Sequence, residues 1–156
     1  MVIRFRLCAA LVLVAALSGC ASSSKQQSSF KTPSGWPVAP AKVVVTAEFG
    51  APRGGSRHQG IDLAAPAGTP VRATADGKVF FAGKDGRYGR TVLINHGGGY
   101  RTRYAHLKKI DTKQGKRVRR GDQIGRVGKS GNASGAHLHY EVIKNGTPVN
   151  PRAYLE

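Results

Sequence analysis

The chain of 156 residues is 40% hydrophobic and contains 21 Gly and 8 Pro, which is typical of one loop-rich globular domain with a short appendage. Lys and Arg number 25 against 8 Asp and Glu, so the formal net charge is +17. This charge would suit a nucleic-acid partner, but the aromatic residues are not interleaved with the basic run 113–122 as base stacking requires. We therefore expect no nucleic-acid partner, and we interpret the run as a solvated hairpin edge guarded by charge.

The N-terminus has the pattern of an export signal. Arg4 and Arg6 precede an apolar run at 7–17, which is about half the length that a bilayer-spanning helix needs. The run leads into "LSGC", which resembles the lipobox of bacterial lipoproteins, and this resemblance implies that Cys20 is acylated and becomes the mature N-terminus. An ordinary signal cleaved elsewhere is the alternative. We predict a lipoprotein signal peptide at 1–19 and attachment to a membrane through lipid on Cys20.

The two cysteines limit the chemistry of the mature chain. Cys8 would leave with the signal and Cys20 would carry lipid, so no thiol would remain for a disulfide or a thiolate metal ligand. A metal site must then use His and carboxylates. Residues 20–35 are rich in Ser and Gln and poor in apolar side chains. We expect a flexible tether there that keeps the folded part, residues 36–156, close to its membrane.

From Trp36 onwards the sequence shows short strand patterns separated by turn signals. Segments rich in β-branched and aromatic residues lie at 42–48, 69–75, 78–82, 90–96, 100–107, 123–128 and 137–143. Glycine-containing turn signals lie at 76–77, 85–86, 97–99 and 145–146. No segment after the signal shows a sustained 3.6-residue period. We therefore predict an all-β fold, an antiparallel β-sandwich or partly open barrel.

Two histidine patterns are candidates for metal binding. In "GAHLHYE", His137 and His139 lie one residue apart on a predicted strand, so both imidazoles should point to the same face. His58 and Asp62 lie four residues apart around Gly60, and an extended path would give them a common direction too. Zinc takes His nitrogen and carboxylate oxygen, and catalytic sites use three protein ligands. His58, Asp62 and one of the two strand histidines would supply such a set.

The two remaining histidines differ in their surroundings. In "YRTRYAHL", Tyr104 and His106 would share a strand face, which makes His106 another imidazole available at a pocket. Tyr104 either lines that pocket or is a partly buried aromatic whose hydroxyl is hydrogen-bonded. His96 lies in "NHGGG" at a strand end, and we interpret it as a turn residue with local hydrogen bonds.

These motifs together resemble the lysostaphin/LytM-type zinc metallopeptidases, which cut peptide bonds in peptidoglycan. The resemblance spans about Val44–Leu155 and includes "HQGIDLAAPAGTPVRATADGKV", "RTVLINHGGGYRTRYAHL" and "GAHLHYEV". It implies the β-sandwich or partly open barrel of the LytM type, the duplicated hybrid motif. This chain has Ala136 where the family usually has Pro before the HxH, and Asn132 and Ser134 lie in a loop that often reads Ser or Thr. These departures affect the wall of the substrate groove and remove no ligand.

The resemblance also implies roles for individual residues. One zinc ion per chain would be held by His58, Asp62 and His139, while His106 and His137 would be the catalytic pair. Zinc would lower the pKa of a bound water and polarise the scissile carbonyl. No glutamate is placed to act as the base in the manner of HExxH enzymes, because Glu141 follows His139 by two residues and Glu48 precedes His58 by ten. His106 or His137 must therefore accept the proton and the other stabilise the oxyanion; which does which stays open. Tyr104 and Asn132 are candidates for lining the substrate site.

The expected function is that of a zinc metalloendopeptidase acting on peptidoglycan cross-links, with D-alanyl-diaminopimelate as the bond if the host has an outer membrane. The alternative is a non-catalytic LytM-like activator of a separate cell-wall amidase, although such relatives typically lack a ligand or catalytic histidine. Ala21 follows Cys20 where an Asp commonly retains lipoproteins in the inner membrane. This favours the outer membrane, facing the periplasm, in a Gram-negative host. We expect peptidoglycan as a partner, together with proteins of cell division or of cell-wall synthesis and hydrolysis.

Overall fold

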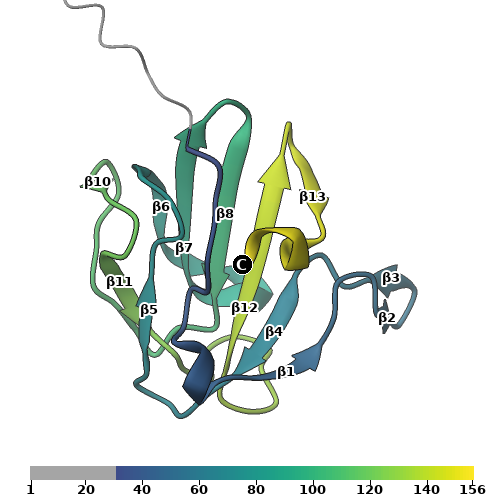
Figure 1. Cartoon of the computed structure of the whole chain (residues 1–156). Helices are drawn as coiled ribbons and strands as arrows, with labels where there is room; N and C mark the ends of the chain where they lie inside the picture. Colours follow the sequence, from purple (N-terminus) through teal and green to yellow (C-terminus); the bar gives the residue numbers. More distant parts are fainter. Residues whose placement is uncertain (1–30) are drawn as a thin grey trace, which may run out of the picture.

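The computed structural model describes residues 31–156 (Figure 1). The predicted signal peptide, Cys20 and most of the predicted tether therefore lie outside the described residues. Within the part that is described, no helix is both long enough and apolar enough to cross a bilayer.

The chain folds into antiparallel strands joined by turns and short 3-10 helices. The strands are β1 (Val44–Ala47), β2 (Pro52–Arg53), β3 (Ser56–Arg57), β4 (Ile61–Ala64), β5 (Pro70–Arg72), β6 (Gly77–Asp85), β7 (Gly89–Gly97), β8 (Tyr100–Ala105), β9 (Lys109–Ile110), β10 (Arg117–Val118), β11 (Gln123–Arg126), β12 (His137–Lys144) and β13 (Thr147–Val149). The 3-10 helices are η1 (Pro40–Lys42), η2 (Gly86–Tyr88) and η3 (Pro151–Tyr154). The prediction of an antiparallel all-β fold is confirmed.

One large sheet carries most of the architecture. Its strand order is β1-β4-β12-β8-β7-β6-β10, and β13 also pairs with β12. A second sheet has the order β5-β11-β9, and β2 and β3 form a small hairpin of their own. In Figure 1, β5 and β11 lie to one side of the large sheet and the β2–β3 hairpin projects from the other. Neither larger sheet closes on itself, because each ends in edge strands.

The core is built from alternate residues of the large sheet together with residues of the β5-β11-β9 sheet. On β12, Leu138, Tyr140 and Val142 are fully buried within the apolar cluster, and Val71 and Ile124 join them from β5 and β11. Because side chains alternate along a strand, His137, His139 and Glu141 must point to the opposite face of β12. The large sheet therefore has a core face and a polar face.

A polar network lies within the core face. The hydroxyls of Tyr104 and Tyr140 both lie 3.0 Å from Thr74 Oγ1, and Thr102 Oγ1 lies 3.1 Å from the Tyr104 hydroxyl. His96 extends the chain, with Nε2 2.8 Å from Thr102 Oγ1 and Nδ1–H donating to the carbonyl of Asp76 at 2.8 Å. Burying polar groups costs free energy unless they are hydrogen-bonded, and here they satisfy one another.

The basic run at 113–122 lies at an edge, as predicted. β10 (Arg117–Val118) is the last strand of the large sheet and pairs with β6. Lys113, Lys116, Arg117, Arg119 and Arg120 are exposed. Charged side chains on an edge strand oppose pairing with another chain.

Candidate active site

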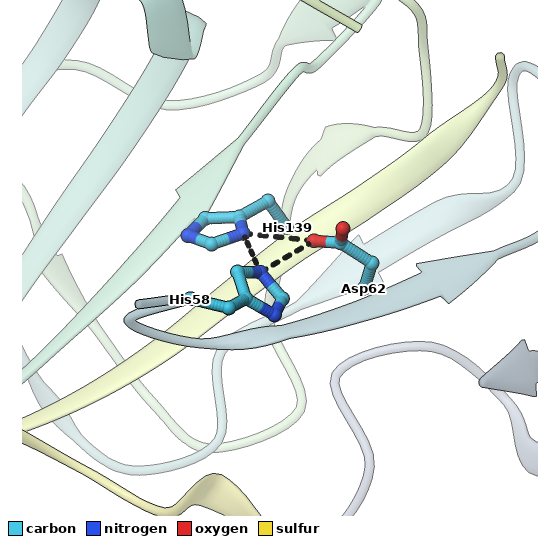
Figure 2. Close-up of side chains that lie close together, drawn as sticks. All are labelled: His58, Asp62 and His139. Atoms are coloured by element: carbon cyan, nitrogen blue, oxygen red, sulfur yellow. Dashed lines mark hydrogen bonds and ion pairs between the residues drawn. The ribbon is translucent and has the colours of Figure 1, made fainter. Parts of the chain in front are cut away.

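Three potential metal ligands converge on the polar face of the large sheet (Figure 2). Asp62 lies on β4 opposite His139 on β12, and the two are direct partners in the strand register. His58 precedes β4 in the loop that follows the β2–β3 hairpin. Asp62 Oδ1 lies 2.8 Å from His139 Nδ1 and 3.1 Å from His58 Nε2, and the two nitrogens are 3.0 Å apart. All three side chains are buried.

The outer atoms of these ligands are fixed by other groups. His58 Nδ1–H donates to the carbonyl of Glu48 at 2.8 Å. His139 Nε2 lies 2.9 Å from Glu141 Oε1, to which it donates. Arg53 donates to Asp62 Oδ2 at 2.5 Å. In its neutral form each imidazole therefore uses its one proton outside the cluster, and the three inward atoms then all carry lone pairs.

Three lone-pair atoms at this separation repel one another unless a proton or a metal ion lies between them. Zinc bonds of about 2.0–2.1 Å with tetrahedral angles place neighbouring ligand atoms about 3.3 Å apart, close to the observed separations of 2.8–3.1 Å. Two imidazole nitrogens and one carboxylate oxygen are also a donor set that zinc accepts, with a fourth position left for water. The residues present fit a catalytic zinc ion.

His106 and His137 lie beside this cluster. His137 begins β12, and its Nε2 is 3.9 Å from Asp62 Oδ1. The ring of His106 lies 4.8 Å from that of His137 and 6.0 Å from that of His139, centroid to centroid. His106 Nδ1–H donates to the carbonyl of Ser130 at 2.8 Å, and His137 Nδ1–H donates to that of Gly135 at 3.0 Å. Both rings thus keep Nε2 available as a proton acceptor.

The backbone explains how His106 reaches the site. β8 ends at Ala105, and His106 has a φ of 60°, a left-handed conformation that L residues seldom adopt. The prediction that Tyr104 and His106 share a strand face was wrong, because the strand ends before His106. Tyr104 stays on the core face, fully buried, and its hydroxyl accepts from the backbone N–H of Thr74 at 3.0 Å. It does not line the pocket and matches the alternative of a buried, hydrogen-bonded aromatic.

Burial and hydrogen bonds shift the acid–base properties of the site. Burial disfavours the charged form of Asp62, but the contacts with His139, His58 and Arg53 outweigh it and hold the pKa of this carboxyl far below its usual range. Burial lowers the pKa of His106, and the nearby His137 and His139 add to this effect. Asp62 is therefore ionised, and His106 is neutral, at neutral pH.

The five residues open onto one pocket of about 610 Å³. Its lining combines His58, Asp62, His106, His137 and His139 with Thr46, Ala47, Arg53, Ser56, Arg57, Gln59, Arg87, Tyr88, Asn132 and Ser134. Asn132 lies in this lining, and its contact with a substrate stays a prediction. His96 lies away from the pocket in the core network, in line with a structural role, although it is buried and not a surface turn residue.

Sequence patterns did not identify several side chains that support the site. Arg53 comes from the β2–β3 hairpin, and Tyr88 from the η2 turn between β6 and β7. No local pattern connects either with the histidine motifs. Glu141 is different, because the two-residue period of β12 places it on the same face as His139. That period was a usable signal for a residue that contacts a ligand.

The chain belongs to Peptidase family M23, whose family model matches residues 56–151. The DD-carboxypeptidase/endopeptidase Mpg of Neisseria meningitidis is 55% identical over 94 residues, covering 60% of this chain and 22% of the relative. The peptidoglycan DD-endopeptidase ShyA of Vibrio cholerae is 48% identical over 93 residues, again covering 60% and 22%. The chain thus matches about a fifth of the length of these relatives.

Solved structures agree with the family. A zinc-containing peptidase from Vibrio cholerae superposes with a TM-score of 0.71 and 36% identity, covering 77% of this chain and 39% of that one. The catalytic domain of lysostaphin from Staphylococcus simulans gives a TM-score of 0.67 and 30% identity, covering 72% and 91%. The resemblance to lysostaphin/LytM-type peptidases is confirmed.

Proposed function

We propose that this protein is a zinc-dependent endopeptidase that cuts peptide cross-links in peptidoglycan, with D-alanyl-diaminopimelate as the scissile bond. One observation carries the proposal: three lone-pair ligand atoms and two further imidazoles meet at one pocket. The family supports peptidase chemistry, and the similarity to a peptidoglycan DD-endopeptidase supports the substrate.

His58, Asp62 and His139 would hold the zinc ion. When bound, zinc would polarise the scissile carbonyl and acidify a water molecule. His106 and His137 supply proton transfer and charge stabilisation from Nε2, because each has its Nδ1–H fixed on a backbone carbonyl. His106 is buried and neutral, which suits a proton acceptor. His137 would donate from Nε2 to the oxygen that gains charge once it carries a second proton as the imidazolium.

The charge of the pocket suits an acidic peptide. Arg53, Arg57 and Arg87 all line it, and the stem peptides of peptidoglycan carry free carboxylates. A pocket of one charge raises the local concentration of a substrate of the other. Arg53 also contacts Asp62, so Arg57 and Arg87 are the two better placed to meet a substrate carboxylate.

The test is digestion of purified cross-linked sacculi, with and without a zinc chelator, followed by mass analysis of the products. We expect cross-linked dimers to be cut between D-alanine and diaminopimelate, activity to stop with chelator, and added zinc to restore it. A zinc-free protein that cuts nothing but raises the activity of a separate amidase would support the activator alternative instead.

We also propose that the domain is anchored through lipid on Cys20 and faces the periplasm from the outer membrane of a Gram-negative host. The "LSGC" sequence and Ala21 support this. Cys20→Ser should abolish incorporation of labelled fatty acid and leave the protein unprocessed or soluble outside the cytoplasm. Wild-type protein that carries no lipid and washes off membranes in high salt would contradict the proposal. Because a single acyl chain binds a membrane only marginally, we expect more than one chain on Cys20.

A further inference from the structure

Glu141 is a carboxylate sealed inside the protein directly behind a proposed zinc ligand. It is 1% exposed, less than the ligand Asp62 at 6%. It lies on β12, two residues after His139 and on the same face. The loop between His58 and Asp62 packs tightly over it, because a Cβ on Gly60 would lie 2.9 Å from both Glu141 Cγ and His139 Cε1. Only glycine fits this approach without a shift of the neighbours.

Three side chains saturate the Glu141 carboxylate. His139 Nε2 lies 2.9 Å from Oε1, and the Tyr88 hydroxyl donates to the same oxygen at 3.0 Å. Arg103 Nη1 donates to Oε1 at 3.3 Å and to Oε2 at 3.2 Å. Arg103 lies on β8 directly opposite Glu141 in the strand register, and its guanidinium stacks 4.2 Å from the centroid of the Tyr88 ring.

His139 differs from the other three histidines of the site in the group that accepts its outer N–H. His58, His106 and His137 each donate their outer N–H to a backbone carbonyl. Only His139, among the four, donates to a charged side chain. A buried carboxylate is expensive to maintain and needs its own cation and hydrogen bonds, which Arg103 and Tyr88 provide. A backbone carbonyl would have satisfied the N–H without that cost.

We propose that Glu141 is a positioning residue for the metal site. Its carboxylate keeps the His139 proton on Nε2, so that the Nδ1 lone pair faces the metal, and it increases the electron density of that ligand. Arg103 and Tyr88 hold the carboxylate in place. Tyr88 also joins this shell to the catalytic side, because its backbone carbonyl accepts from the N–H of His106 at 2.9 Å. The inference rests on the proposed zinc dependence.

The experiment measures zinc affinity by competition with a chromophoric chelator, using full-length protein. We expect Glu141→Ala to weaken binding by about 10–100-fold, the range found when a partner of a metal-bound histidine is removed. Glu141→Gln keeps an acceptor for His139 but loses the charge, so its loss should be smaller. Tyr88→Phe removes one hydrogen bond to Glu141 and should have the smallest effect, below about 10-fold.

Val142→Ala is the matched control. Val142 follows Glu141 on β12, is fully buried and faces the core. Its truncation should lower the melting temperature without changing zinc affinity.

A second comparison adds Arg103→Met to Glu141→Gln. If Glu141 only balances Arg103, removing both should recover stability, and neither the single nor the double variant should lose zinc affinity.

Nitrogen NMR of the zinc-loaded protein gives a readout that general destabilisation does not move. In wild type, His139 should carry its proton on Nε2, and in Glu141→Ala the signal of that proton should broaden or exchange faster. If all Glu141 variants bind zinc as tightly as Val142→Ala, the positioning role is wrong while zinc dependence stands. If wild-type protein itself binds no zinc, it is the proposed function that fails.

Discussion

Two buried histidine environments lie on opposite faces of the same sheet. On the core face, both ring nitrogens of His96 lie 2.8 Å from protein partners, the Asp76 carbonyl and Thr102 Oγ1. On the polar face, His58 and His139 each satisfy one nitrogen with a protein acceptor and turn the other towards further lone pairs. Both environments are buried. Burial alone therefore does not distinguish a metal ligand from a structural histidine. The distinguishing feature is that the inner nitrogens of two imidazoles face each other and a carboxylate oxygen, with no N–H or O–H donor from the described residues between them.

The largest expected effect comes from removing a ligand. His58→Ala, Asp62→Ala or His139→Ala leaves two protein ligands, so we expect zinc affinity to fall by roughly 10²–10³-fold if binding energy is shared among the ligands. Hydrolysis of sacculi should fall to background. Elemental analysis of the dialysed variants, alongside turnover, makes the measurement. If these variants stay zinc-loaded and active, the three residues are not metal ligands, and they would not differ from His96 in this respect.

The second effect separates catalytic groups from ligands on the same face. His106→Ala and His137→Ala should keep close to one zinc per chain and lose hydrolysis by about 10²-fold or more, because each removes proton transfer or oxyanion stabilisation. Zinc content and turnover are measured on the same preparation. Loss of zinc from His137→Ala would mean that both histidines of "HLH" are ligands, and the division of roles within β12 would be incorrect.

The third effect concerns His96. His96→Ala should keep zinc and turnover but lower the free energy of unfolding by about 1–3 kcal/mol, because the Asp76 carbonyl loses its donor and the buried Thr102 hydroxyl loses one of its two partners. Chemical denaturation with the zinc-loaded protein tests this. A variant that keeps its stability but loses activity would place His96 in the catalytic machinery.

His96 should also contribute to the dependence of stability on pH. Burial lowers its pKa, so the unfolded chain binds the proton more readily than the folded one. The stability provided by neutral His96 is then present above its unfolded pKa of about 6.5 and is lost as the pH falls below that value. In His96→Ala, the fall in stability as the pH drops below about 6.5 should be shallower than in wild type.

The smallest expected effect comes from the edge, away from both histidine environments. Lys113, Lys116 and Arg117 are exposed, and exposed charges act over a Debye length of about 8 Å at physiological ionic strength. Binding of the protein to sacculi should weaken as salt rises, and a Lys113→Gln, Lys116→Gln, Arg117→Gln variant should show a shallower salt dependence. Its turnover on small soluble cross-linked peptides should match wild type. Salt-independent binding would assign recognition to the pocket alone.

The fold class could be predicted from short strand periods, and the residues that meet at the candidate site could be predicted from short spacings together with the family resemblance. Alternation along β12 predicted that His137 and His139 share a face, and their positions agree with it. The strand β4 was not among the predicted strands, because its four residues are mostly buried and include the polar Asp62. The residues of β4 are buried because β1 and β12 pair with it on either side, and a local sequence pattern does not show these neighbours.

The remaining parts of the site depend on contacts between distant segments. Tyr104 and His106 point apart because the backbone changes direction after Ala105, and no residue type in "YAHL" requires that change. Arg53 contacts the proposed ligand Asp62 across a separation of 9 residues. Tyr88 contacts Glu141 across a separation of 53 residues. Spacing can indicate which residues are chemically suited to a site, but the supporting shell follows from how the loops pack.

The left-handed backbone of His106 has a consequence for selection. A left-handed conformation costs a residue with a Cβ roughly 1–2 kcal/mol, so folding alone would favour glycine or asparagine at this position. The proposed mechanism requires the imidazole, so the fold would keep the strained backbone for activity. Activity and stability therefore compete at one residue. His106→Gly should lose hydrolysis while relieving the backbone, and descendants that bind the wall without cutting it would be free to drift towards glycine or asparagine here.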